Sequence, residues 1–175
     1  ARMLEVSIQE MSLYSPAAIV EEFERALLSE LDFDRERNHL HTFRALYAES
    51  PLIWIPKPFD DLSNGTLLVM ERITGIKITE APPDTEAAKE LALRIIDLLY
   101  TMLFEHGTFH GDPHPGNILL TPDNRLGLID FGLVGHLSRR QQDTLVSLII
   151  SVVSGDIDGI ARAGLSLGHA RKHIP

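Results

Sequence analysis

The stretch His110-Gly111-Asp112-Pro113-His114-Pro115-Gly116-Asn117, followed by Asp130-Phe131-Gly132, decides the fold and the chemistry of this chain. It places an acid at Asp112, an amide five residues later at Asn117, and a second acid, Asp130, on a short turn. Carboxylate and amide oxygens are hard ligands that suit Mg²⁺. The pattern therefore predicts a site that holds a metal ion against phosphate groups. The same stretch also contains a His-x-Asp-x-His run, so a histidine metal cluster is an alternative.

Composition narrows the class of protein. The chain has 175 residues, a net charge of -9 and no cysteine. That length suits one domain or a large part of one. The negative charge speaks against a nucleic-acid partner, and the absence of cysteine excludes disulfides and thiolate metal sites. No apolar run approaches the ~20 residues that a membrane helix needs, and the first residues lack a signal-peptide pattern.

A long helical region is predicted before residue 49. Ser15-Pro16 is a good helix start, because serine can cap a helix and proline suits its first position. Apolar residues recur at spacings of three and four up to about Ala48. One uninterrupted helix of that length would be long for a globular domain. We therefore expect a break near Asp32-Phe33-Asp34, whose acids can cap a second helix.

Strands are predicted after residue 50, where three prolines exclude helix. Ile53–Ile55 and Thr66–Ile73 are β-rich runs, and the loop over Asp60–Gly65 is of the hairpin type.

The second half of the chain is predicted to combine helices with one hairpin. The expected elements are a helix from Asp84 or Thr85 to Gly107, strands over 118–120 and 126–129, a helix from the Ser138 capping box to Ser154, and a helix over 157–165.

This order of elements is that of a protein kinase from its regulatory helix to its metal-binding turn. Leu67–Ile73, followed by Gly75, looks like a kinase hinge. On that resemblance Met70 would be the gatekeeper, and backbone groups of Glu71 and Ile73 would bond adenine. The run also fits a plain core strand that leads to a turn.

A charged run, Glu30-Leu31-Asp32-Phe33-Asp34-Arg35-Glu36-Arg37-Asn38, precedes the hinge. By composition alone it fits a solvated helix face. Placed before the hinge and the His-Gly-Asp-Pro loop, it resembles the UbiB family of atypical protein-kinase-like ATPases, which are linked to coenzyme Q (ubiquinone) biosynthesis and membrane lipid homeostasis. The resemblance covers nearly the whole chain.

The resemblance implies an α+β, protein-kinase-like fold. A partial N-lobe with the regulatory helix and hinge strands would span residues 1–73, and a mostly helical C-lobe would span residues 74–175. The implied cofactors are ATP and Mg²⁺. A lipid or isoprenoid precursor and a membrane surface are the further partners it implies, in the cytoplasm or on an organelle or bacterial inner membrane.

Residue roles follow from the same resemblance. Glu36 matches the regulatory-helix glutamate that pairs with the nucleotide-binding lysine. Glu30 and Asp32 match the Glu-x-Asp signature that meets an N-terminal extension folded over the active site. The other matches are the catalytic-loop acid at Asp112 and the Mg²⁺ ligands at Asn117 and Asp130.

The chain also departs from ordinary protein kinases. Gly111 stands where most of them have an arginine, and the next helix is expected within about six residues of Gly132. Because that leaves no room for a peptide-holding activation segment, we expect no protein-peptide substrate. A phosphate loop, the lysine strand and the family's Lys-x-Gly-Gln extension are also absent from this sequence. We therefore expect a fragment that lacks the first N-lobe strands and binds ATP weakly by itself.

Three alternatives remain open. Small-molecule phosphotransferases of the aminoglycoside or choline kinase type share the His-Gly-Asp-x-x-x-x-Asn loop. A non-catalytic kinase-like scaffold is the second, and a metallohydrolase that uses His110, Asp112 and His114 is the third. The other histidines belong to no recognisable constellation; among them are His39, His41, His106 and His136.

Overall fold

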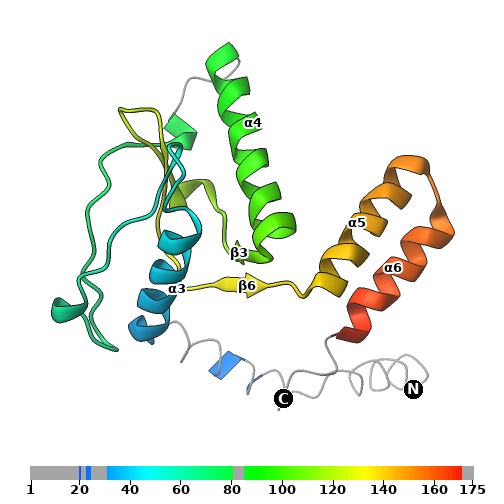
Figure 1. The fold of residues 1–175 in the computed structure, drawn as a ribbon, viewed down its shortest axis with the longest axis horizontal. Coiled ribbons are helices and arrows are strands. Elements are labelled where there is room, and N and C mark those ends of the chain that lie inside the picture. Colours follow the sequence, from blue (N-terminus) through cyan, green and yellow to red (C-terminus); the bar gives the residue numbers. More distant parts are fainter. Residues whose placement is uncertain (1–19, 21–22, 25–30, 81–84, 171–175) are drawn as a thin grey trace, which may run out of the picture. The chain divides into compact units, whose positions relative to one another are not determined.

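The computed structural model describes residue 20, residues 23 and 24, and residues 31–80 and 85–170 (Figure 1). The predicted helix start at Ser15-Pro16, the signature residue Glu30 and the predicted cap Asp84 lie outside the described residues. Helices and short strands occur together, which confirms the α+β class. Two compact units divide the chain: residues 1–75 with 119–132, and residues 76–118 with 133–175. The predicted division into lobes after residue 73 stays a prediction.

The first unit contains helix α3 (Phe33–Leu46), which begins at the predicted acidic break. Asp32 is its N-cap, and the Asp32 side chain accepts a hydrogen bond from the Asp34 amide at 3.1 Å. This bond satisfies one of the amides that a helix start leaves without an internal partner. Leu40 and Phe43, on the inner face of α3, are fully buried.

Three short strands accompany α3 in this part of the chain. Strands β4 (Ile118–Leu120) and β5 (Leu126–Leu128) are neighbours, as the hairpin prediction requires. The turn between them includes Asn124, which has a φ of 64° and tolerates this left-handed conformation better than most residues. Strand β1 (Ile53–Trp54) pairs with β5 in parallel.

The predicted strand over Thr66–Ile73 is wrong as a continuous element. Only isolated bridges form in this stretch, between Pro58 and Met70 and between Asn64 and Leu67. Proline has no backbone N–H, so Pro58 cannot donate to a strand ladder beside it. The short helix η1 (Asp60–Leu62) occupies the middle of the predicted hairpin loop.

The second unit begins with β2 (Ile76–Lys77) and the short helix η2 (Ile78–Glu80). Helix α4 (Glu86–Tyr100) follows, capped by Thr85, and continues as the π-helical segment η3 (Thr101–His106). Gly107, with a φ of 63°, ends it as predicted. The left-handed conformation of a helix terminator favours glycine because it has no Cβ.

Strand β3 (Thr108–His110) then leads into the Asp112 loop, whose short helix η4 (Pro115–Asn117) directly precedes β4. Strand β6 (Val134–His136) pairs with β3 in antiparallel fashion.

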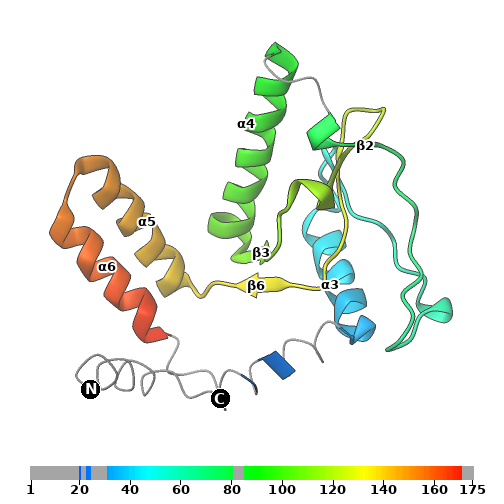
Figure 2. The ribbon, with the colours of Figure 1, turned by 180° about the vertical axis from the view of Figure 1, so that it is seen from behind.

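Two packed helices complete this unit. Helices α5 (Arg139–Ser154) and α6 (Ile157–Ala170) lie side by side, as Figures 1 and 2 show. The Ser138 capping box and the Gly155 terminator, with a φ of 71°, are both present as predicted. Helix α6 continues past the predicted end at residue 165. Within the described residues, no helix is both long and apolar enough to cross a membrane.

Removal of the capping box should destabilise this unit. Ser138 accepts a hydrogen bond from the Gln141 amide, and the Gln141 side chain accepts one from the Ser138 amide. Ser138→Ala should lower the free energy of unfolding by about 1 kcal/mol in urea denaturation. The matched control is Ser147→Ala, on an exposed position within α5, where alanine is a better helix former. Equal effects of the two changes would show that the cap does not matter.

Candidate nucleotide and metal site

The Asp-Phe-Gly turn is fastened to one face of α3. The Phe131 amide donates to Glu36 Oε1 at 3.0 Å, and the Phe131 carbonyl oxygen lies 2.7 Å from Nδ1 of His39. The fully buried Phe131 ring packs on Phe43, with 4.9 Å between ring centroids. Glu36, His39 and Phe43 follow one another at spacings of three and four, so they lie on one helix face. Both backbone groups of Phe131 and its ring are therefore held by α3.

Asp130, next to this anchored phenylalanine, points its side chain to solvent. Its φ is 62°, in the left-handed region that costs energy for most residues with a Cβ. The Gly132 amide donates to Asp130 Oδ1 at 3.4 Å. The turn thus buries Phe131 and leaves the Asp130 carboxylate exposed, where it can bind a cation.

The Asp112 loop, in the second unit, is held by its own side chains. The Asn117 side-chain amide donates to the Asp112 carbonyl oxygen at 3.1 Å. Because the NH₂ end of Asn117 is engaged in this way, its Oδ1 oxygen remains to accept a ligand. His110 Nδ1 accepts from the Asp112 amide at 3.2 Å, and His114 Nδ1 accepts from the Gly116 amide at 3.0 Å.

These two histidine bonds give His110 and His114 a structural role in the loop. Among the described residues, no three His, Cys, Asp or Glu side chains are grouped so that they could hold a metal ion. The Nδ1 atoms of His110 and His114 are therefore engaged within the loop, and the alternative cluster of His110, Asp112 and His114 is not among the groups that the described residues form.

Gly111 explains why this loop lacks the arginine of ordinary kinases. Its amide donates to the Leu133 carbonyl oxygen at 2.8 Å. A Cβ at position 111 would lie 2.6 Å from Cγ of Leu133, closer than real side chains approach each other. A larger residue here would therefore displace Leu133.

The three residues predicted to form the hinge differ in burial and in backbone hydrogen bonding. The Glu71 amide donates to the Lys57 carbonyl oxygen at 2.8 Å, so the Glu71 carbonyl is the backbone group that adenine could use. Ile73 is buried, whereas Met70 is half-buried. The roles of Met70, Glu71 and Ile73 in adenine binding stay predictions.

Of the two residues of the predicted Glu-x-Asp signature, the structure describes only Asp32. Asp32 caps α3, which is a structural use of its carboxylate, and Glu30 lies outside the described residues. The site residues Asp112 and Asn117 belong to the second unit, and Glu36, Asp130 and the hinge belong to the first.

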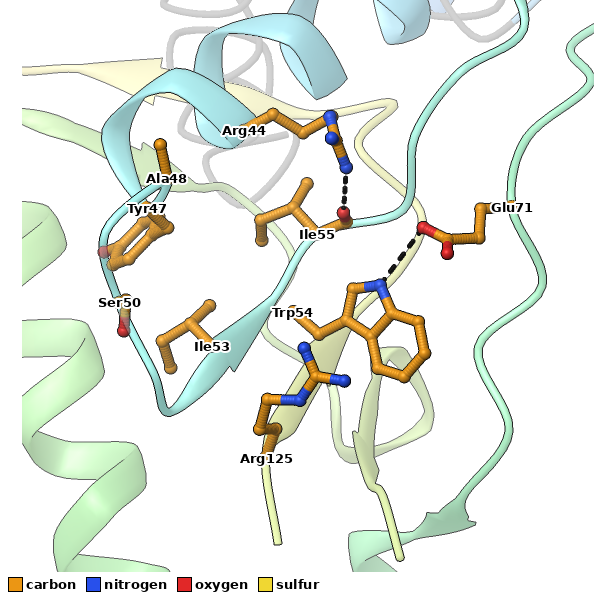
Figure 3. Close-up of a pocket in the computed structure, with 9 residues that line it drawn as sticks. All are labelled: Arg44, Tyr47, Ala48, Ser50, Ile53, Trp54, Ile55, Glu71 and Arg125. Atoms are coloured by element: carbon orange, nitrogen blue, oxygen red, sulfur yellow. Dashed lines mark hydrogen bonds between the residues drawn. The ribbon is translucent and has the colours of Figure 1, made fainter. Parts of the chain in front are cut away.

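Sequence reasoning missed a cluster beside the predicted hinge, shown in Figure 3. Trp54 Nε1 donates to Glu71 Oε2 at 3.2 Å, and the Arg125 guanidinium lies 4.1 Å from the centroid of the Trp54 ring. Arg44 of α3 donates to the Ile55 carbonyl oxygen at 2.7 Å. No local pattern could have found this cluster, because the parallel pairing of β1 with β5 brings Arg125 to Trp54. The contact of His39 was also missed, because its partner Phe131 is distant in the sequence and no local pattern links the two.

The fold and the site together define a protein-kinase-like chain with an Asp-Asn loop and an Asp-Phe-Gly turn. A model of the family described as ABC1 atypical kinase-like domain matches residues 1–164. The chain belongs to this family, which confirms the predicted resemblance and counts against the aminoglycoside and choline kinase alternative.

Known relatives agree with this family. The chain is 34% identical over 161 residues to Protein ACTIVITY OF BC1 COMPLEX KINASE 1, chloroplastic, of Arabidopsis thaliana, covering 88% of this chain and 23% of that protein. It is 32% identical over 176 residues to the Probable protein kinase UbiB of Aliivibrio fischeri, covering 96% of this chain and 32% of that protein. The chain therefore spans a third or less of the length of these two relatives.

A solved structure supports the fold. The complex of Rv3197 with erythromycin from Mycobacterium tuberculosis superposes with a TM-score of 0.68 at 23% sequence identity. The match covers 93% of this chain and 42% of that one. This likeness confirms the predicted kinase-like fold.

The contact between α3 and the Asp-Phe-Gly turn can be tested directly. Glu36→Ala removes the acceptor of the Phe131 amide, so this amide should exchange with solvent faster by about tenfold or more, since a bond to a charged group contributes about 1.5–3 kcal/mol. Hydrogen exchange followed by NMR measures the change.

Two variants control this experiment. Glu36→Gln keeps an acceptor oxygen and should lose less protection, and Glu49→Ala removes an exposed acid just beyond α3 and should change nothing at Phe131. Unchanged Phe131 exchange in Glu36→Ala would show that the hydrogen bond does not hold the turn.

Proposed function

We propose that this chain is the part of an ATP-dependent, Mg²⁺-requiring kinase-like enzyme or ATPase that carries the catalytic loop and the metal-binding turn. Membership of the ABC1 family supports the class. The observation that carries the proposal is the Asp-Phe-Gly turn, in which α3 holds Phe131 and leaves the Asp130 carboxylate exposed.

The donor set suits Mg²⁺. Asp130 offers an exposed carboxylate, and Asn117 offers Oδ1 because its NH₂ end is bound to the Asp112 carbonyl. Oxygen ligands of this kind are the ones that Mg²⁺ prefers. Mg²⁺, when bound by Asn117 and Asp130, would neutralise phosphate charge during phosphoryl transfer.

We propose that Asp112 is the acidic residue of the catalytic loop that faces the acceptor. Its carboxylate is exposed, and its backbone is held on both sides, through its N–H by His110 and through its C=O by Asn117. We assign it the orientation of the acceptor hydroxyl or water and the uptake of its proton. Because its backbone is fixed, the Asp112 side chain samples fewer orientations, which favours this role.

A protein peptide is not the acceptor that this chain favours. Peptide-phosphorylating kinases hold their substrate with a long activation segment after the Asp-Phe-Gly turn. Here β6 begins at Val134 and α5 at Arg139, so little chain remains for such a segment. We propose a lipid or isoprenoid precursor, or water, as acceptor.

The wider role is proposed from the UbiB resemblance. The protein would support ubiquinone or isoprenoid lipid metabolism, at a membrane surface or in the cytoplasm. A relative named as a probable protein kinase UbiB supports this choice. Glu30 and Asp32 would meet a segment folded over the site, and Glu36 would also pair with a nucleotide-binding lysine.

Loss of the Asp130 charge should abolish nucleotide binding that depends on Mg²⁺. In the full-length protein, Mg-ATP should raise the melting temperature, and Asp130→Asn should remove this shift because a neutral amide offsets less of the Mg²⁺ charge than a carboxylate does. Asp61→Asn, an exposed acid of the same unit, is the matched control and should keep the shift. If Mg-ATP shifts neither the unaltered protein nor the control, the chain is a scaffold and the enzyme proposal fails.

Asp112→Asn should separate binding from turnover. Mg-ATP affinity should stay within about twofold, whereas the rate of ATP consumption should fall by about 10²–10⁴-fold if Asp112 acts as a base. Calorimetry and a phosphate-release assay on the full-length protein measure the two quantities, with Asp158→Asn on α6 as control. Normal turnover in Asp112→Asn would refute the assigned role.

A further inference from the structure

The turn that follows η1 contains the single Asn-Gly pair of the chain, Asn64-Gly65. Asn64 is exposed and pairs with Leu67 through two backbone hydrogen bonds, of 2.8 Å from the Asn64 amide and 3.1 Å to the Asn64 carbonyl oxygen. Gly65 and Thr66 therefore form the tip of a tight turn. Exposed tips of this kind are the places where a folded chain is most open to chemical change.

Gly65 supplies a peptide nitrogen that can reach the Asn64 side chain. The side-chain carbonyl carbon of an asparagine, Cγ, can form a ring with the next peptide nitrogen, and a Cβ on that next residue normally hinders the approach. Glycine has no Cβ. Within residues 31–80 and 85–170, the Gly65 N–H donates to no backbone or side-chain acceptor. This nitrogen is therefore unhindered and unengaged in the described part of the chain.

The carbonyl oxygen of the Asn64 side chain is held by two donors. The Thr66 amide and the Thr66 hydroxyl each donate to Asn64 Oδ1 at 2.9 Å. A backbone amide can only donate, which identifies this atom as the oxygen and not the amino group. Donors on a carbonyl oxygen stabilise the negative charge that develops there when a nucleophile attacks the carbon. The turn thus activates Cγ of Asn64.

The amino group of the Asn64 side chain is the group that would leave. Both printed contacts of this side chain are made by Oδ1, so the amino group bonds to no residue of the described ranges. Because Asn64 is exposed, water can reach this group and protonate it as it leaves.

We propose that Asn64 is a site of spontaneous deamidation through a cyclic imide. The Gly65 nitrogen loses its proton to hydroxide or water and forms a bond to Cγ of Asn64. The bond from Cγ to the side-chain nitrogen breaks, and ammonia leaves with a proton from water. Water then opens the imide at either carbonyl and gives aspartate or isoaspartate, with no oxidation or reduction. This inference does not depend on the proposed enzymatic function.

The reaction would alter the start of α3. The Gly65 carbonyl oxygen accepts a hydrogen bond at 3.1 Å from the amide of Phe33, the first residue of α3. Isoaspartate lengthens the main chain before Gly65 and would displace this carbonyl. Both products also add a carboxylate to a turn whose Gly65 already lies beside the Asp34 carboxylate. Deamidation should therefore weaken the bond between this turn and α3.

Mass spectrometry of the full-length protein tests the site. After incubation at mildly alkaline pH, the mass of the Asn64 peptide should rise by the difference between an oxygen atom and an NH group. Fragmentation should identify isoaspartate, and the rate should rise with pH because the attacking nitrogen must lose its proton. The other three asparagines, each followed by a larger residue, are internal controls that should keep their masses: Asn38, Asn117 and Asn124.

Variants of the turn locate the chemistry. Gly65→Ala should prevent conversion over the period in which the unaltered protein converts, and its Cβ would meet only side-chain atoms of Asp34, the nearest at 3.3 Å. Thr66→Val removes one of the two donors to Oδ1 and should slow conversion by about threefold, the effect of one ordinary hydrogen bond. Thr66→Ser keeps the hydroxyl and should convert at the unaltered rate.

Hydrogen exchange followed by NMR measures the effect on α3. In the converted protein, the Phe33 amide should exchange faster by about two- to tenfold, because it loses its acceptor on Gly65. Unchanged Phe33 exchange would contradict the expected effect on α3.

Three results would overturn the proposed site. One is conversion at Asn64 that is no faster than at the three control asparagines. Another is unaltered conversion in Gly65→Ala. The third is equal conversion rates in Thr66→Val and Thr66→Ser, which would show that the hydroxyl does not activate Cγ.

Discussion

The hydrogen bond from the Phe131 amide to the Glu36 carboxylate is the contact on which the candidate site depends. It joins helix α3 to the Asp-Phe-Gly turn across a long separation in sequence, and a second contact, between His39 and the Phe131 carbonyl, supports it. Both backbone groups of Phe131 are engaged and its ring is buried. Asp130, directly before it, has a left-handed backbone conformation and an exposed side chain.

In the second unit, the Asp112 loop is likewise held by hydrogen bonds between side chains and backbone groups. Side chains that look like metal or catalytic groups in the sequence, His110 and His114, accept hydrogen bonds from backbone amides of the loop. Asn117 donates to the backbone in the same way and keeps its oxygen for another partner. Polar side chains thus form hydrogen bonds with nearby backbone groups, and a small set of side-chain oxygen atoms remains to bind a ligand.

Features set by local sequence could be predicted, because caps and turns depend on a few adjacent residues. The Asp32 cap, the Ser138 capping box and the glycines that end two helices are of this kind. The hairpin of β4 and β5 was predictable for the same reason.

Contacts between distant segments were not predictable. The strand over Thr66–Ile73 was expected from its β-branched and apolar residues, but Pro58 in the neighbouring segment cannot complete the ladder. The parallel pairing of β1 with β5 left no signal in either strand, and the cluster of Trp54 and Arg125 depends on it. The site residues were predicted from motif resemblance. That resemblance predicted a lysine partner for Glu36 but not its hydrogen bond with the Phe131 amide.

The most direct test of the proposed metal site is to locate the bound ion. Mn²⁺ can replace Mg²⁺ in the ATP complex of the full-length protein, and its unpaired electrons broaden NMR signals of nearby nuclei. We predict selective broadening of the Asn117 side-chain amide and of the Asp130 and Phe131 backbone amides, with the Ser147 amide of α5 unaffected. Broadening centred elsewhere, or none at these residues when Mn-ATP is bound, would contradict the proposed metal site.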